Sequence, residues 1–242
     1  FLDIKAAYDS VDHNILLTKL RDRGCGSQLL RMVQQLMCGV QSVINVNGFD
    51  SEPLEHTAGV LQGSIISPAL YSLYINDLAE AIRTVLPGEQ SVFMYADDVA
   101  VIVDDEGKLA DLRRVLEEHS ILTNYKYNVR KCEILNSSVD AILYDDRMTH
   151  CTSFKYLGCI VDKDGIRWDW HIDRLEAKTR TMLNFLRSVG YNQGGFRERT
   201  RITIFKTFLR PLWEYCLCVM PHVKRHLDRL NRLQHECLVA LF

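Results

Sequence analysis

The sequence has 242 residues, of which 47% are hydrophobic and 25% charged, and its net charge is −2. Five prolines and 13 glycines exclude a low-complexity chain, and the length suits one large domain or two small ones. The sequence contains no run of about 18 apolar residues, so it predicts no membrane-spanning helix. The eight cysteines form no C-x-x-C pair, and most lie in apolar stretches. We interpret them as reduced thiols of an intracellular protein, in the cytoplasm or the nucleus.

Charge is divided unevenly along the chain. Residues 1–166 hold 15 Lys/Arg and 24 Asp/Glu, whereas residues 167–234 hold 14 Lys/Arg and 6 Asp/Glu. An acidic part followed by a basic part suits a metal site beside a surface that binds phosphates. Ordinary surface charge on helices is the stronger alternative when this feature is taken alone.

The first elements combine a strand, two helices and a hairpin. Residues 1–4 predict a short strand that ends at an acidic residue. Apolar residues at helical spacing over 12–38 predict two helices, with a break at Gly24–Gly26. Residues 42–62 alternate in polarity and predict a hairpin around Asn47-Gly48.

The following elements surround an acidic turn. Ser67 and Pro68 predict a helix start, with Ser67 as its N-cap. Residues 92–103 predict two strands around a tight turn, and a helix is expected over about 107–124. Further strands are expected near 129–135, 141–148 and 154–161, and helices over 168–189, 197–210 and 223–242. We place a domain boundary after residue 165, between an α+β domain (1–165) and an all-α domain (166–242).

Two adjacent acids occupy the turn between the strands of 92–103. Asp97 and Asp98 carry like charges at the end of a hydrophobic hairpin, where burial without a cation is costly. Carboxylate oxygens are the ligands that Mg²⁺ takes, usually together with substrate phosphates. A turn with both side chains in solvent is an equally good interpretation of this pair alone. Asp3 ends the first predicted strand, and if that strand pairs with either strand of 92–103, three carboxylates converge. Such a cluster predicts a two-metal site for attack of a hydroxyl on a phosphate.

Five segments together resemble the reverse transcriptases. Phe-Leu-Asp-Ile-Lys-Ala-Ala-Tyr-Asp-Ser-Val-Asp-His at the start resembles motif A, and Phe-Met-Tyr-Ala-Asp-Asp-Val-Ala-Val resembles motif C. The matching ranges, in motif order A to E, are 1–13, 60–70, 93–101, 128–133 and 154–160. The sequences of motifs A and E are most similar to those of non-LTR (LINE-type) retrotransposons. The resemblance extends to about residue 162 and implies a polymerase palm, followed by a helical thumb and lacking most of the fingers.

The resemblance implies a role for each matching residue. Asp3, Asp97 and Asp98 match the triad that binds two Mg²⁺ ions, with Mn²⁺ as a possible substitute. Lys131 matches a lysine that protonates the leaving pyrophosphate. The residues implied beside the incoming nucleotide are Tyr8, Gln62, Gly63 and Tyr95, with Tyr8 as the steric gate against a ribose 2′-hydroxyl. Those implied in the primer grip are Phe154, Lys155, Tyr156, Leu157 and Gly158.

Each assignment has a structural alternative. Tyr8 could be a core aromatic residue, Gly63 could be required only by a turn, and Lys131 could be an ordinary surface lysine. Cys216, Cys218, His222 and His226 are zinc-ligand residue types. The two cysteines are closer than in the usual zinc knuckle, so we interpret them as core thiols.

The resemblance predicts an RNA-directed DNA polymerase whose partners are an RNA template, a DNA primer and dNTPs, with no membrane. The alternative is an inactive nucleic-acid-binding relic or a domesticated module. The chain starts inside a strand with Phe1, so we expect it to be a segment of a retrotransposon polyprotein. We expect this segment to be inactive by itself, because the fingers should precede motif A.

Overall fold

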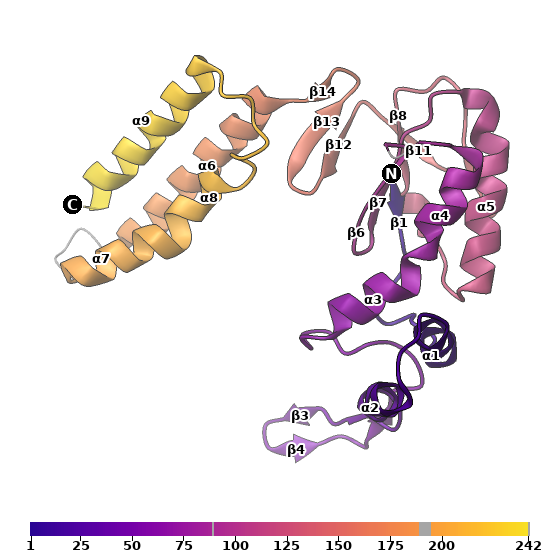
Figure 1. Ribbon diagram of the computed structural model, residues 1–242. Coiled ribbons are helices and arrows are strands. Elements are labelled where there is room, and N and C mark those ends of the chain that lie inside the picture. The colour runs from indigo at the N-terminus through magenta and orange to yellow at the C-terminus, as the bar shows by residue number, and fades with distance from the viewer. Residues whose placement is uncertain (89, 189–194, 242) are drawn as a thin grey trace. The chain divides into compact units, whose positions relative to one another are not determined.

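The computed structural model describes residues 1–88, 90–188 and 195–241, and it separates into two compact units (Figure 1). The first unit is Phe1–Cys151 and the second is Thr152–Phe242. This division lies ahead of the boundary predicted after residue 165. The mixed helices and small sheets of the first unit confirm the α+β class.

The first unit is built around a three-stranded antiparallel sheet in the order β1-β7-β6. Its strands are β1 (Leu2–Asp3), β6 (Val92–Tyr95) and β7 (Asp98–Val101). Leu2 pairs with Val99, and Val92 pairs with Val101. The predicted pairing of the first strand with residues 92–103 is therefore confirmed.

The described residues of the first unit form the α-helices α1 (His13–Asp22), α2 (Ser27–Met37), α3 (Ser67–Ile75), α4 (Asp77–Val85) and α5 (Leu109–Leu122). The Asp12 carboxylate caps α1 by accepting hydrogen bonds from the backbone of Asn14 and Ile15. Gly24 has a φ of +80° and ends the helix, as the sequence predicts. Helix α4 packs against both β6 and α5 (Figure 1).

One predicted helix cap is wrong. Ser67 is the first residue of α3 rather than its N-cap, which is Ile66. The Ser67 hydroxyl instead donates a 2.7 Å hydrogen bond to the carbonyl of Leu61, where it ties the helix to the preceding loop. Pro68 does lie in the first turn, where its missing N–H has no consequence.

Short strands complete the first unit. The predicted hairpin at Asn47-Gly48 is confirmed, while residues 129–131 form a 3-10 turn rather than the start of a strand. The remaining strands are β2 (Gln41–Ser42), β3 (Asn45–Val46), β4 (Phe49–Asp50), β5 (Leu54–Glu55), β8 (Glu133–Leu135), β9 (Ile142–Leu143), β10 (Asp146–Arg147) and β11 (Thr149–Cys151).

Tyrosines give the core of the first unit a polar character. Tyr71, Tyr74, Tyr125 and Tyr127 are all buried among aliphatic side chains. The Tyr125 and Tyr127 hydroxyls lie 2.8 Å apart, and the Tyr74 hydroxyl donates to the carbonyl of Thr123. These hydrogen bonds satisfy groups that would be costly to bury alone.

The second unit joins a small antiparallel sheet to helices. Its strands are β12 (Ser153–Tyr156), β13 (Cys159–Asp162) and β14 (Gly165–Ile166). Its helices are α6 (Trp168–Ser188), α7 (Glu198–Ile204), α8 (Arg210–Glu214) and α9 (Lys224–Leu241), with a π-helical segment at Phe205–Leu209 between α7 and α8. The helix ends predicted at residues 189 and 242 lie outside the described residues.

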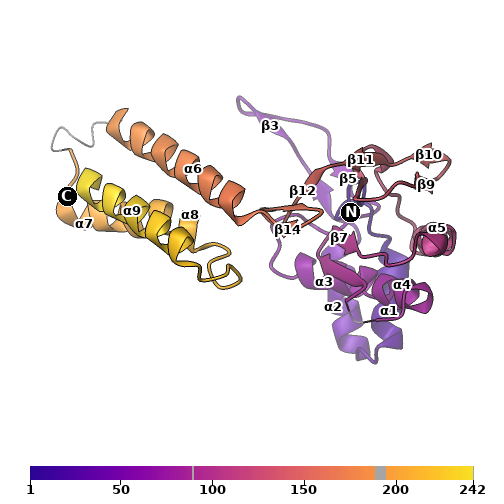
Figure 2. The ribbon, with the colours of Figure 1, turned by 90° about the horizontal axis from the view of Figure 1, so that it is seen from above.

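Helices α6 and α9 lie side by side in both views (Figures 1 and 2). Leu183, Leu233 and Cys237 belong to their shared core, which also includes Trp213 of α8. Arg229 of α9 forms salt bridges with Asp173 and Glu176 of α6, with N–O distances of 2.5 and 3.0 Å. Across the described part of the chain, no helix combines the length and apolar character needed to cross a membrane.

Candidate catalytic site

The central sheet brings the three predicted carboxylates together. Asp3 lies directly opposite Asp98 in the β1–β7 register, and Asp97 precedes Asp98 in the β6–β7 turn. Ala96 has a φ of +53°, which lets the turn close in two residues. Asp97 and Asp98 are exposed, and Asp3 is half-buried.

The acids repel one another. Burial, followed by the negative charges of Asp97 and Asp3, raises the pKa of Asp98. A divalent cation at this point would remove the repulsion, and carboxylate oxygens suit a hard ion such as Mg²⁺ or Mn²⁺. The residues present therefore fit a divalent metal site.

The segment around motif D lies along β1. The Asn128 backbone N–H donates a 2.8 Å hydrogen bond to the Asp3 carbonyl, and the Lys5 backbone N–H donates a 2.8 Å hydrogen bond to the Lys126 carbonyl. Lys131 is exposed in the 3-10 turn that follows. The structure thus places the Lys131 backbone next to the strand of Asp3, while its role stays a prediction.

Tyr8 stacks on a residue that the sequence analysis did not select. Its ring lies 4.8 Å from the ring of Tyr71, with 18° between the ring planes. Tyr71 belongs to α3 and is 1% exposed, whereas Tyr8 is half-buried. Burial, and after it the charge of Asp97, raises the pKa of Tyr71. The Tyr71 ring therefore packs against the candidate gate residue Tyr8, and the charge of Asp97 in the acidic turn acts on its hydroxyl group.

A sequence signal for Tyr71 exists but is weak. The helix that Pro68 opens places Tyr71 one residue after the apolar Leu70, which marks it only as a candidate core residue. Its contact with Tyr8 joins residues 63 positions apart, and helical periodicity carries no information about such a pair.

Motifs A and B are joined by backbone hydrogen bonds. The Gly59 N–H donates to Val11 and the Val60 N–H donates to Tyr8, each at 2.8 Å. Gly59 has a φ of +92°, and a Cβ there would lie 3.0 Å from the backbone of Asp9. Only glycine allows this close approach of the two segments.

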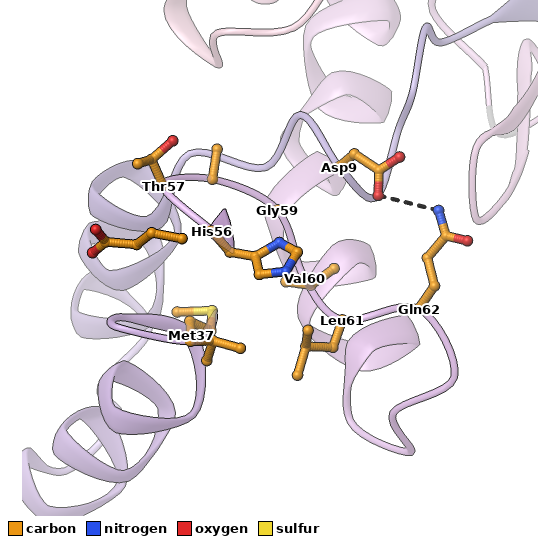
Figure 3. Close-up of a pocket in the computed structure, with 11 residues that line it drawn as sticks. Asp9, Met37, His56, Thr57, Gly59, Val60, Leu61 and Gln62 are labelled. Atoms are coloured by element: carbon orange, nitrogen blue, oxygen red, sulfur yellow. Dashed lines mark hydrogen bonds between the residues drawn. The ribbon is translucent and has the colours of Figure 1, made fainter. Parts of the chain in front are cut away.

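Gln62 lies beside Asp9 at the edge of a pocket of about 500 Å³. The Gln62 side-chain amide donates a 3.1 Å hydrogen bond to the Asp9 carboxylate, drawn as a dashed line in Figure 3. Met37 and His56 line the same pocket (Figure 3). Residues of motif B and the end of α2 thus line the same pocket.

Two other predicted nucleotide-binding residues lie at the surface. Tyr95 is 66% exposed and pairs with Asp98 across the β6–β7 turn. Gly63 has a φ of +88°, and a Cβ built there would meet nothing within 4 Å. Its backbone conformation accounts for the glycine, and a close approach to substrate stays a prediction.

The predicted primer-grip residues form a hairpin of the second unit. Phe154, Lys155 and Tyr156 lie in β12, and the turn is Leu157-Gly158 with φ values of 44° and 86°. The Tyr215 hydroxyl donates a 2.7 Å hydrogen bond to the Leu157 carbonyl. The hairpin is confirmed, and its contact with a primer stays a prediction.

The sheet that brings Asp3 next to the Asp97-Asp98 turn lies within a region that matches a known protein family. The family profile described as reverse transcriptase (RNA-dependent DNA polymerase) matches residues 1–161. The chain belongs to the reverse transcriptase family. The resemblance of its motifs is therefore confirmed.

Curated relatives come from non-LTR retrotransposons. The chain is 26% identical to the RNA-directed DNA polymerase from the mobile element jockey of Drosophila funebris, and 27% identical to that of Drosophila melanogaster. It is 23% identical to the probable RNA-directed DNA polymerase from transposon X-element of Drosophila melanogaster. Each alignment covers 98% of this chain and 27% of the relative. The chain thus spans about a quarter of the length of these reverse transcriptases.

Proposed function

We propose that the chain carries the polymerase site of an RNA-directed DNA polymerase from a non-LTR retrotransposon. The observation that carries the proposal is the register that sets Asp3 opposite Asp98, with Asp97 adjacent in the turn. The family match and the names of the relatives support the same reaction. The substrates would be dNTPs, and the partners an RNA template and a DNA primer.

The three carboxylates would hold two divalent ions. When bound, the ions would favour ionisation of the primer 3′-hydroxyl and neutralise charge on the pyrophosphate. Asp3 and Asp98 would hold them from facing strands, and Asp97 from the turn. Their mutual repulsion would favour the binding of a cation over that of a neutral ligand.

Residues of motifs A and B would select the nucleotide. Tyr8 would exclude a ribose 2′-hydroxyl, and the stacked ring of Tyr71 would hold Tyr8 in place. Gln62 and Gly63 would border the nucleotide beside the pocket of Figure 3. Tyr95 is exposed next to the acids, where it could contact the end of the primer.

Two further regions would act on the leaving group and the primer. Lys131 would stabilise the departing pyrophosphate, by donating a proton or by its charge. The β12–β13 hairpin, with Phe154–Gly158, would position the primer 3′ end. Both roles rest on the motif resemblance together with the backbone positions described above.

The test is primer extension on an RNA template with dNTPs and Mg²⁺, using the longest natural chain that contains these residues. We expect extension in the wild type and none in an Asp97→Asn/Asp98→Asn double variant. Equal extension by the two proteins would exclude polymerisation at this site. A wild type that binds template and primer without extending them would favour the inactive, nucleic-acid-binding alternative.

A further inference from the structure

We propose that Cys159, His171 and Cys216 form a binding site for one zinc ion in the second unit. The ligand atoms of these three residues all lie within 4.8 Å of one another. Two thiolates and an imidazole are a donor set that zinc prefers, and such sites take a water molecule as the fourth ligand. Cys159 belongs to the segment 154–160 that resembles motif E, whereas His171 and Cys216 lie outside the five motifs.

The strongest observation is the state of His171. It is 2% exposed, and neither ring nitrogen makes a hydrogen bond of normal geometry among the described residues, although the backbone carbonyls of Tyr215 and Gly158 lie near the ring. A buried imidazole normally donates from one nitrogen and accepts at the other, so a ring with no hydrogen bond of normal geometry at either nitrogen is open to a further ligand. A metal ion bound to one nitrogen supplies the missing interaction.

Three separate elements converge on the site. Cys159 is the first residue of β13, His171 lies in the first turn of α6, and Cys216 follows α8. Cys159 is buried and Cys216 is half-buried. A site assembled from a hairpin, a helix and a loop would join the elements that must stay together for the second unit to fold.

Other contacts hold the three elements in this arrangement. The Arg174 guanidinium donates a 2.5 Å hydrogen bond to the Gly158 carbonyl, which ties α6 to the hairpin. The Tyr215 ring lies so close to Gly158 that a Cβ there would come within 2.9 Å of it. The ring centroids of Trp168 and His171 lie 5.9 Å apart, with the two rings nearly perpendicular. These contacts orient the ligands before an ion binds.

The sulfur–sulfur distance permits an ion with a small adjustment. The two Sγ atoms lie 3.1 Å apart, well beyond a disulfide bond of about 2.05 Å. Two thiolates on one tetrahedral zinc lie about 3.8 Å apart, given Zn–S bonds of about 2.3 Å. Rotation of the half-buried Cys216 side chain could supply the difference. Each thiol gives its proton to solvent as its Zn–S bond forms, so two protons leave per zinc bound.

The sequence pattern pointed to a different set of residues. The His226 Nε2–H donates a 3.3 Å hydrogen bond to the Asp169 carboxylate, and Cys218 is exposed. Cys216 is the one member of the Cys216–His226 pattern that lies in the cluster. The interpretation of Cys216 as a plain core thiol is therefore replaced by that of a ligand.

The test begins with the wild-type chain under reducing conditions. Cobalt(II) is titrated as a spectroscopic substitute for zinc, and bound zinc is measured by mass spectrometry of the metal. We expect thiolate-to-cobalt charge-transfer absorption that saturates at one equivalent, and one zinc per chain that displaces the cobalt. Absence of this absorption at one equivalent overturns the proposal.

Variants assign the ligands. Cys159→Ser and Cys216→Ser should each lower zinc affinity at least about 100-fold, since they remove direct ligands. Cys218→Ser is the matched control, two residues away and exposed, and should bind as the wild type does. Unchanged affinity in both ligand variants overturns the proposal, as does an equal loss in the Cys218→Ser control.

Thiol labelling of the wild type decides the matter if the ligand variants do not fold. Zinc should slow alkylation of Cys159 and Cys216, mapped by peptide mass, while leaving Cys218 unchanged. Equal labelling of all three with and without zinc overturns the site. A peptide that links Cys159 to Cys216 through a disulfide in the reduced sample also overturns it.

Discussion

The two side-chain clusters of this protein differ in burial and in chemistry. The Asp3–Asp97–Asp98 cluster has oxygen donors, and two of its three members are exposed. The Cys159–His171–Cys216 cluster has sulfur and nitrogen donors, and two of its members are buried. An exposed oxygen cluster leaves space for phosphates and water around a hard ion, as a reaction with nucleotides requires. A largely buried cluster of sulfur and nitrogen donors suits a softer ion such as zinc.

The first way to sharpen this contrast is to remove one exposed acid. Asp97→Asn should reduce primer extension at least about 1,000-fold, because metal ions contribute several kcal/mol to such reactions. The melting temperature should change little, since Asp97 is exposed. Extension rates and thermal melts on the same preparation measure both effects. Asp104→Asn, which removes an exposed acid outside the five motifs, is the control and should retain far more activity.

The second prediction concerns Tyr71, the buried support of the exposed site. Tyr71→Ala should cost about 3–5 kcal/mol of unfolding free energy, as for other large aromatic truncations in a core. Tyr71→Phe should leave the unfolding free energy unchanged or raise it slightly, because it removes a buried hydroxyl that has no hydrogen-bond partner among the described residues. Denaturant unfolding measures both. Similar losses in the two variants would show that the hydroxyl, not the ring, stabilises the core.

The third prediction compares two glycines with similar backbone conformations. Gly59→Ala should destabilise the fold by about 2–3 kcal/mol, because a positive φ is combined with contact against Asp9. Gly63→Ala should cost about 1 kcal/mol, because only the positive φ opposes it. Urea unfolding of both variants measures the difference. Equal costs would mean that the close approach of motifs A and B does not need glycine.

The smallest expected effect is the pH dependence of Asp98. Its pKa is raised in the folded protein, so its ionisation opposes folding as pH rises from the unfolded pKa through the folded one. Without metal, Asp98→Asn should therefore increase the unfolding free energy at pH 7 by less than about 1 kcal/mol, with solvent screening limiting the gain. The difference should vanish below the unfolded pKa of about 4. A stabilisation that persists at pH 3 would assign the effect to something other than charge.

Much of the first unit followed from local sequence patterns. The hairpin at Asn47-Gly48 and the helix break at Gly24 use turn residues with local conformational preferences, and the strands around Asp97-Asp98 follow from two apolar runs. The meeting of Asp3 with Asp98 was expected only on condition that the strands paired, because pairing depends on contacts between residues distant in sequence.

The features that sequence did not predict depend on such distant contacts. Ser67 is a good N-cap by residue type, yet its hydroxyl bonds to Leu61 and the helix begins with it. The stacking of Tyr8 on Tyr71 and the convergence of Cys159 with Cys216 each join separate elements. Spacing rules describe neighbours on one element, so the residues near Cys216 gave no indication of Cys159 or His171.

The most direct test of the carboxylate cluster is a measurement of Mn²⁺ binding to the chain. Binding is detected as loss of the free-ion signal in electron paramagnetic resonance. We expect the wild type to bind Mn²⁺, and Mg²⁺ to compete. An Asp97→Asn/Asp98→Asn double variant should lose most of this binding, while Cys159→Ser should retain it. Equal Mn²⁺ binding by the wild type and the double variant would contradict the assignment of Asp3, Asp97 and Asp98 as the metal site.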